Sequence, residues 1–246
     1  MLAILDELAR SGPVLSADAL ISRLGYSRGT GYRYIKTLVA KGLLQRLANG
    51  YGLGPRITEL DFQLRESDPV LSLLGPLIKQ LSEETEGHAL LAQFFDDRVV
   101  VTLQEVGTSR IRVSYGRGRR LPLFLGAPSK AILSALPRAR QRRLYEAHSA
   151  EAAAAGLGGS WEAFRTALAK LARQKIVTSF GELDHGNVGI ATAVRGLESG
   201  RPMSLALVFA DSRYSIMDKK DLERRLRNTT DLIAERLRVE DQVPAR

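Results

Sequence analysis

One ten-residue stretch decides the fold: Ser27-Arg28-Gly29-Thr30-Gly31-Tyr32-Arg33-Tyr34-Ile35-Lys36. Its first residue is a preferred N-cap, because a serine hydroxyl can accept a hydrogen bond from a backbone N–H of the first helical turn. The apolar residues Ile35, Leu38 and Val39 face one side of the predicted helix, and Gly42 stands where a C′ glycine would end it. The cations and hydroxyls of the stretch are therefore expected to face solvent.

Two shorter helices are predicted before this one and a β-hairpin after it. Apolar periodicity predicts a helix over 2–9, and Ser16 caps a second helix over 17–24. The run 43–53 changes to a strand pattern around Asn49-Gly50, a pair that favours a two-residue hairpin turn because both residues tolerate positive φ. Three helices followed by a hairpin is the order of a winged helix-turn-helix, whose recognition helix enters the DNA major groove.

The third predicted helix and its surroundings carry residue types that bind DNA. Arginine and lysine contact guanine edges or phosphates, hydroxyls bind either more weakly, and a helix N-terminus suits a phosphate. A solvated basic helix face is the plain alternative, and the order of the elements favours DNA binding over it. The candidate DNA-binding residues are Ser16, Ser27, Arg28, Thr30, Tyr32, Arg33, Lys36 and Arg46. Two glycines in the same helix, Gly29 and Gly31, either permit close approach to DNA or only weaken the helix.

Composition and charge restrict the functions that remain. The chain has 246 residues, a formal net charge of +9, three histidines and no cysteine. The absence of cysteine excludes disulfides, thiol nucleophiles and thiolate metal sites. Residues 1–65 carry nine cations against five acids, whereas the remaining +5 is spread over 181 residues. This concentration of positive charge in the first quarter of the chain points to double-stranded DNA as the partner.

Neither membrane insertion nor catalysis is expected. No apolar run approaches the ~20 residues of a membrane span, and residues 1–7 do not resemble a signal peptide, so a cytoplasmic protein is expected. Asp184 and His185 could be imagined as an acid/base pair beside Glu182, but adjacent strand residues point to opposite faces. We therefore expect no catalytic residue, no metal site and no cofactor.

A linker of two helices is predicted between two domains. Residues 1–60 form the DNA-binding domain, 61–85 the linker helices, and 86–246 a second domain for effector binding and oligomerisation. Because proline is tolerated at the start of a helix but not inside it, one linker helix is expected to end near Leu74 and the other to begin at Pro76.

The second domain is predicted to be α+β, an antiparallel sheet with helices on its faces. A hairpin is expected with its turn at Asp96-Asp97. The expected strands are 89–95, 99–106, 111–115, 176–180, 188–194 and 203–209. The expected helices are 129–136, 138–148, 161–174 and a last one with Leu222, Leu226, Ile233 and Leu237 on one face, with 151–159 as a connector.

Several ordered motifs resemble those of the IclR family of bacterial transcriptional regulators. They are Leu2-Ala3-Ile4-Leu5, Thr30-Gly31-Tyr32-Arg33-Tyr34-Ile35, Lys41-Gly42-Leu43, Tyr51-Gly52-Leu53-Gly54-Pro55-Arg56, Leu121-Pro122-Leu123, Ser129-Lys130-Ala131-Ile132-Leu133 and the run Gly181–Ala191. The resemblance covers most of the chain. It implies an N-terminal winged helix-turn-helix and a C-terminal GAF-like domain that binds a small effector, in a homodimer or a dimer of dimers.

The resemblance also implies positions for the effector pocket. Carried over by position, these are Phe124, Ala127, Pro128, Ser129, Ser179, Gly189, Ala191, Leu207 and Phe209. Leu207 and Phe209 stand where some family members have small polar residues, so the pocket is expected to be apolar. An organic acid or aromatic effector then fits better than a small hydrophilic acid such as glyoxylate. Ordinary core packing is the alternative for each of these residues.

Two other functions remain open at this point. The second domain could serve only for oligomerisation, in which case no small molecule would bind. Alternatively, the chain could be a small-molecule enzyme of GAF-like architecture whose N-terminal domain no longer binds DNA.

Overall fold

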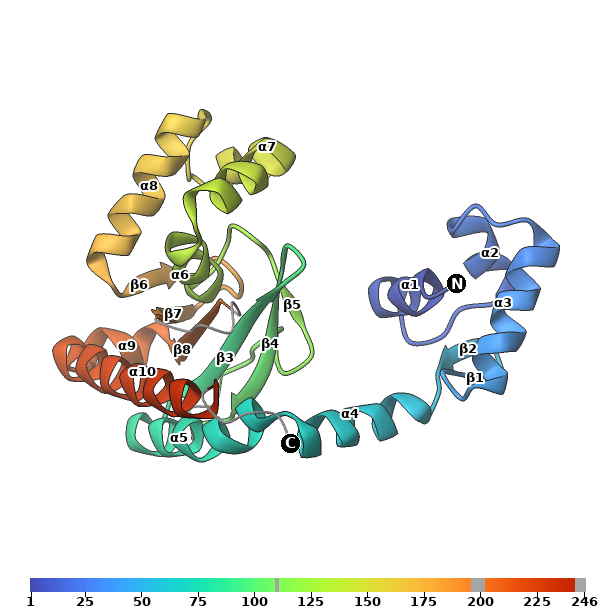
Figure 1. Cartoon of the computed structure of the whole chain (residues 1–246), viewed down its shortest axis with the longest axis horizontal. Helices are drawn as coiled ribbons and strands as arrows, with labels where there is room; N and C mark the ends of the chain where they lie inside the picture. Colours follow the sequence, from blue (N-terminus) through green and yellow to red (C-terminus); the bar gives the residue numbers. More distant parts are fainter. Residues whose placement is uncertain (109–110, 196–201, 242–246) are drawn as a thin grey trace. The chain divides into compact units, whose positions relative to one another are not determined.

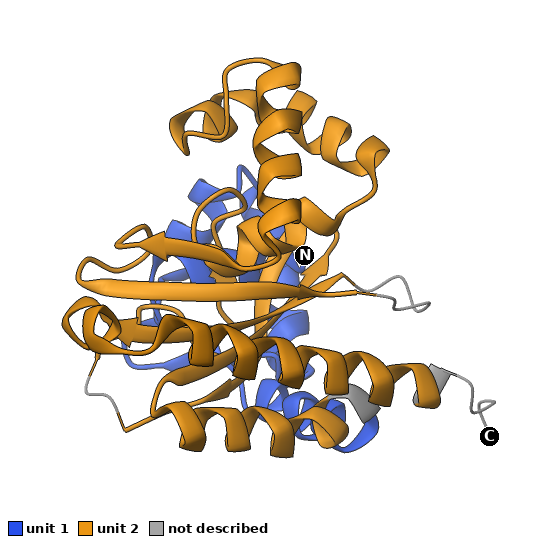
Figure 2. Cartoon of the chain, turned by 90° about the vertical axis from the view of Figure 1, so that its left-hand side faces the viewer, with its two compact units in different colours: residues 1–68 blue, residues 69–246 orange. Residues whose placement is uncertain are grey.

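The computed structural model describes residues 1–108, 111–195 and 202–241, and the chain divides into two compact units (Figures 1 and 2). Unit 1 is Met1–Asp68 and unit 2 is Pro69–Arg246. The predicted linker 61–85 is divided between them, because its first helix belongs to unit 1 and its second to unit 2. The α+β class predicted from the sequence is confirmed.

Unit 1 has the predicted order of helices and hairpin. Its elements are α1 (Ala3–Ser11), α2 (Ala17–Arg23), α3 (Arg28–Ala40), β1 (Leu44–Leu47), β2 (Gly50–Leu53) and α4 (Arg56–Ser67). Both predicted serine caps are confirmed: the Ser16 hydroxyl accepts from the amide of Ala19 at 3.1 Å, and that of Ser27 from the amide of Thr30 at 3.3 Å. A small apolar core holds α1, α2, α3 and β1 together.

The turn of the hairpin differs from the prediction. Leu47 pairs with Gly50, so the two turn residues are Ala48 and Asn49 rather than Asn49 and Gly50. Gly50 is required for a different reason. Its φ is +146°, and a Cβ there would lie 2.3 Å from the carbonyl oxygen of Leu15. The glycine thus allows β2 to approach the segment between α1 and α2.

The break between the two linker helices also differs from the prediction. α5 (Pro69–Thr85) continues through Pro76, and the chain leaves helical conformation at Asp68 instead. A residue before proline avoids the α region, and Asp68 has φ −90° and ψ 105°. Pro76 is preceded by Gly75, which has no Cβ to clash with the proline ring.

Unit 2 is built on a six-stranded antiparallel sheet of order β5-β4-β3-β8-β7-β6. The strands are β3 (His88–Phe95), β4 (Arg98–Glu105), β5 (Arg120–Leu121), β6 (Val177–Phe180), β7 (Asn187–Val194) and β8 (Met203–Ala210). Its helices are α5, α6 (Ala127–Ala135), α7 (Arg138–Ala154), α8 (Trp161–Gln174), α9 (Asp211–Ile216) and α10 (Lys219–Asp241). The sheet separates two apolar cores, one toward α5 and α10 and the other toward α6, α7 and α8 (Figure 1).

Most predicted elements of unit 2 are confirmed, including the hairpin β3–β4, which turns at Asp96 and Asp97 with φ values of 42° and 59°. Three elements differ from the prediction. Residues 111–115 are not a strand, and the short β5 pairs with β4 instead. α7 continues past the predicted end, with a kink at His148 (φ −137°, ψ 33°). α9 was not predicted from the sequence.

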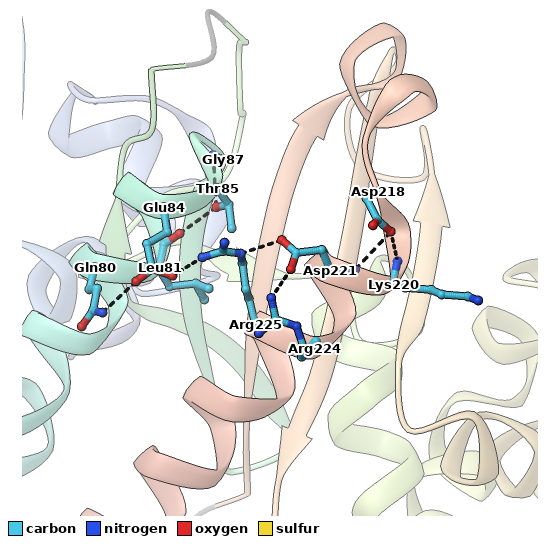
Figure 3. Close-up of polar contacts among 10 residues, drawn as sticks. All are labelled: Gln80, Leu81, Glu84, Thr85, Gly87, Asp218, Lys220, Asp221, Arg224 and Arg225. Atoms are coloured by element: carbon cyan, nitrogen blue, oxygen red, sulfur yellow. Dashed lines mark hydrogen bonds and ion pairs between the residues drawn. The ribbon is translucent and has the colours of Figure 1, made fainter.

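A charged cluster connects α5 to α10 (Figure 3). Arg225 donates hydrogen bonds to Glu84 of α5 at 2.5 Å and to Asp221 at 2.7 Å, and Arg224 also binds Asp221. Hydrogen bonds from Arg225 and Arg224 lower the pKa of Asp221, and those to Asp221 and Glu84 raise the pKa of Arg225. Asp221 and Arg225 therefore both remain charged at neutral pH.

Candidate nucleic-acid interface and ligand site

The candidate DNA-binding residues lie on the surface of unit 1. Seven of the eight are exposed, and Thr30 is half-buried. Arg28, Tyr32, Arg33 and Lys36 project from α3, and their spacing of one, three and four residues spreads them over more than one side of the helix. Arg46 lies on β1, in the wing.

Two of these candidates already have a structural role. Besides capping α3, the Ser27 hydroxyl donates a hydrogen bond to Oγ1 of Thr30 at 3.0 Å. The Ser16 hydroxyl is the cap of α2. Their presence is thus explained by helix capping, whether or not they also contact DNA.

The two glycines of α3 have different environments. A Cβ on Gly31 would lie 2.3 Å from Cγ1 of Ile21, so this glycine allows α2 and α3 to pack closely. A Cβ on Gly29 would meet no atom within 4 Å. Only Gly29 therefore remains as a position for close approach to a ligand.

Alanine substitutions should separate these two roles. Gly31→Ala is expected to destabilise unit 1 by about 1–3 kcal/mol, because the new methyl group overpacks against Ile21. Gly29→Ala should stabilise α3 by up to about 1 kcal/mol, because glycine is unfavourable inside a helix. Thermal unfolding followed by circular dichroism checks both signs. Equal effects of the two substitutions would contradict this account.

In unit 2, polar contacts hold the start of α6 against β6 and the β6–β7 loop. The amide of Gly126 donates to Oε2 of Glu182 at 2.7 Å, and that of Ala127 to the hydroxyl of Ser179 at 3.0 Å. Lys130 donates to Oε1 of Glu182 at 2.6 Å, and only 11% of its side chain is exposed. These contacts bring segments more than 50 residues apart in sequence to one place.

Seven of the nine candidate effector residues lie at this place. All seven are buried and belong to the α6 side of the sheet; they are Phe124, Ala127, Pro128, Ser129, Ser179, Gly189 and Ala191. Ser179 and Gly189 are paired across β6 and β7, and a Cβ on Gly189 would lie 3.3 Å from the Ser179 hydroxyl. The absence of a side chain at 189 leaves room for the Ser179 hydroxyl and for Ala127 at the start of α6.

The other two candidates, Leu207 and Phe209, lie on the opposite face of the sheet. They belong to the core toward α5 and α10, where Phe209 stacks on Tyr214 with ring centroids 6.4 Å apart. The expectation that they line the same pocket is wrong, because alternate residues of a strand face opposite sides. On β8 the residues that share the α6 face include Ala206, Val208 and Ser204, whose hydroxyl donates to the carbonyl of Pro128 at 3.0 Å.

Ser129 is the polar residue of this site without a partner in the described structure. It is completely buried in the first turn of α6, and its hydroxyl makes no hydrogen bond. A buried polar atom without a partner costs free energy unless a ligand or water satisfies it. The nearby Ser179 hydroxyl is already paired with the amide of Ala127, and much of the remaining wall is apolar, so the Ser129 hydroxyl is the group that a ligand here could satisfy.

Tyr115 and a cluster of aromatic rings belong to the same apolar core as the start of α6. Tyr115 is buried with Phe124, and burial, together with the nearby Asp184 carboxylate, raises the pKa of its phenol. Tyr115 therefore stays neutral at physiological pH. Phe124 packs edge-to-face on Phe164 at 5.9 Å, and Trp161 lies 6.2 Å from Phe164. Tyr115, Glu182 and Lys130 were not predicted as site residues from the sequence.

Neither a metal site nor a membrane helix is found in the described parts of the chain. No group of three or more histidine, aspartate or glutamate side chains there is arranged to hold a metal ion. Likewise, within residues 1–108, 111–195 and 202–241 no helix is long and apolar enough to cross a membrane.

Comparison with protein families matches nearly the whole chain. Residues 63–235 match the family model described as bacterial transcriptional regulator IclR C-terminal, and residues 1–48 match the IclR helix-turn-helix domain. The regulator Rv1719 of Mycobacterium tuberculosis is 35% identical over 131 residues, covering 52% of this chain and 50% of that protein. TtgV of Pseudomonas putida is 32% identical over 125 residues, covering 50% and 48%. The matches thus span about half the length of these relatives.

Solved structures show the same fold at low sequence identity. An IclR regulator from Alicyclobacillus acidocaldarius has a TM-score of 0.77 at 18% identity, covering 96% of each chain. An IclR homologue from Microbacterium hydrocarbonoxydans, solved in complex with 4-hydroxybenzoate, has a TM-score of 0.72 at 19% identity, again covering 96% of each chain.

Proposed function

Because the chain belongs to the IclR family of bacterial transcriptional regulators, we propose that unit 1 binds DNA sequence-selectively and that unit 2 binds a small organic effector that alters this binding. The observation that carries the DNA-binding part is the exposed polar face of α3. Capped by Ser27 and packed on α2 through Gly31, this helix presents Arg28, Tyr32 and Arg33 to solvent. Such a protein acts on the chromosome, and hence in the cytoplasm.

Arg33→Ala tests the DNA-binding part of the proposal. If Arg33 contacts a guanine edge, its loss should weaken binding to the cognate duplex by about 1–3 kcal/mol and leave random duplexes unaffected. If Arg33 binds phosphate, the affinity for every duplex should fall by the same factor. Fluorescence anisotropy with the duplex upstream of the coding sequence and with random duplexes distinguishes the two. An unchanged affinity for every duplex would remove Arg33 from the interface.

For the effector, we propose a small organic acid or aromatic compound bound beside the start of α6. Three features support this class of ligand: the buried apolar wall with Phe124 and Ala191, the glycine at 189, and the unpartnered hydroxyl of Ser129. The fold relative from M. hydrocarbonoxydans holds 4-hydroxybenzoate, a ligand of this chemical class.

Trp161 provides a direct assay of effector binding, because it is the only tryptophan and belongs to the aromatic cluster that includes Phe124. Titration with 4-hydroxybenzoate should change its fluorescence saturably, whereas glyoxylate should have no effect. Ser129→Ala should weaken the binding of 4-hydroxybenzoate about fivefold, which is the effect expected from the loss of one ordinary hydrogen bond. No saturable change with either compound would favour the alternative in which unit 2 serves only for oligomerisation.

We further propose that the functional unit is a homodimer or a dimer of dimers. No residue of α4 is buried, and Leu60 and Leu64, one helical turn apart on it, are 42% and 52% exposed. Apolar side chains gathered on an exposed helix are typical of an interface, here with a second copy of the chain. A dimer would present two α3 helices to half-sites about 34 Å apart or a multiple of this. Sedimentation of the full chain as a monomer at micromolar concentration would contradict the proposal.

The enzyme alternative requires turnover of a small molecule together with indifference to DNA. The relatives are named transcriptional regulators, which favours binding over catalysis.

If the effector changes DNA affinity, it must bind two arrangements of the protein with different affinities.

A further inference from the structure

One acidic residue interrupts the basic stretch of unit 1 that contains α2, α3 and the wing. Between Glu7 and Glu59 the sequence contains eight cations and a single acid, Asp18. This residue lies in the first turn of α2, directly after the capped start, and 66% of its side chain is exposed. An acid at a helix start gains a modest interaction with the helix dipole. That gain does not explain which groups its carboxylate contacts.

The carboxylate of Asp18 lies opposite two candidate DNA-binding residues of α3. Its Oδ1 is 3.4 Å from Nη2 of Arg28 and 3.5 Å from the hydroxyl of Tyr32. Arg28 and Tyr32 are one helical turn apart, so a single oxygen contacts both ends of that turn. Exposed single-contact pairs of this kind contribute little to stability. A role in the free protein's stability is therefore a weak reason for this arrangement.

The position has a definite consequence for DNA binding. A carboxylate at the reading surface repels phosphate oxygens, which weakens every complex that places backbone phosphates there. A guanidinium has five N–H donors, so Arg28 can keep its contact with Asp18 and still donate to a guanine edge. Contact between Arg28 and phosphate, in contrast, would bring that phosphate close to Asp18.

We propose that Asp18 is a specificity-determining residue, whose carboxylate orients Arg28 and Tyr32 toward base edges and disfavours binding through phosphates alone. The inference rests on the proposed DNA binding of unit 1. Asp18 thus acts on specificity mainly by weakening the wrong complexes rather than by strengthening the right one.

Asp18→Asn in the full chain tests this, because it keeps the shape and removes the charge. Affinities are measured by anisotropy at ~0.15 M salt for the duplex upstream of the coding sequence and for a random duplex of equal length. The variant should bind random duplex about fivefold tighter, and the slope of log affinity against log salt concentration should become steeper by about one unit. Its affinity for the upstream duplex should change less than twofold. The ratio of the affinity for the upstream duplex to the affinity for random duplex should therefore fall about fivefold.

A matched control and a double variant separate this role from a general charge effect. Glu7→Gln removes the same charge from unit 1, where Glu7 pairs with Arg10 and Arg23. It should leave the ratio of affinities unchanged. In an Arg28→Ala background, Asp18→Asn should change the ratio less than twofold, because no guanidinium remains at position 28 to bring a phosphate close to Asp18.

Three results would overturn the inference. An unchanged ratio in Asp18→Asn, or an equal fall in Glu7→Gln, would show that Asp18 has no special role while leaving the proposed DNA binding intact. A wild-type protein that does not prefer the upstream duplex would instead contradict the DNA-binding proposal itself, and this inference with it.

Discussion

Glu182→Ala is expected to lower the free energy of unfolding of unit 2 by about 3 kcal/mol. The carboxylate of Glu182 accepts from both Lys130 and the amide of Gly126, so its loss leaves a mostly buried ammonium group and the first amide before α6 without their partners. Removing one partner of a buried ion pair costs about 3–5 kcal/mol. The lower end applies because 26% of the Glu182 side chain is exposed. Urea unfolding followed by Trp161 fluorescence measures the change, since Trp161 lies in unit 2.

Two controls test this explanation. Glu182→Gln keeps an acceptor for the Gly126 amide and should cost less than Glu182→Ala. Glu146→Ala removes an exposed carboxylate paired with Arg142 at 2.8 Å within α7, and should change stability by no more than about 0.5 kcal/mol. If Glu146→Ala and Glu182→Ala had the same effect, the buried pair would not hold α6 in place.

Gly50→Ala is expected to detach the wing from the segment between α1 and α2. The substitution combines an unfavourable φ of +146° with a contact of 2.3 Å to the Leu15 carbonyl, and each of these costs about 1–3 kcal/mol. The amides of Leu15 and Tyr51 donate to each other's carbonyls at 3.0 and 2.8 Å. Their hydrogen exchange should accelerate about a hundredfold, which corresponds to about 3 kcal/mol.

Asn49→Ala is the matched control for this prediction. If the turn were built on Asn49-Gly50, as the sequence suggested, loss of the asparagine would also weaken the hairpin. Because the turn residues are Ala48 and Asn49 and neither has a positive φ, exchange should change less than twofold. Strong acceleration in Asn49→Ala would restore the original interpretation of the turn.

Local chemistry in the sequence predicted much of unit 1. Ser16 and Ser27 cap their helices through amides three residues away, so neighbouring residues suffice to identify the helix starts. The contacts of Gly31 and Gly50 could not be predicted, because Ile21 and Leu15 reach them only after the chain folds. The same limit concealed Asp18, whose partners are 10 and 14 residues away.

The ligand site of unit 2 was predicted less completely, for a reason that lies in the sheet. β7 and β8 are buried on both faces, so their sequences do not alternate between apolar and polar residues. Nothing in the run 203–209 itself shows which residues face α6, and Leu207 and Phe209 were assigned to the wrong face. The ion pair of Lys130 with Glu182 was missed because 52 residues separate its partners.

The central claim is that α3 and the wing read a DNA sequence. Its most direct test is the affinity of the purified full chain for the intergenic duplex upstream of its coding sequence, compared with random duplex at ~0.15 M salt. Specific sites are typically bound at least about a thousandfold tighter than random DNA, and we expect a preference of this order. Equal affinity for the two duplexes would contradict the account.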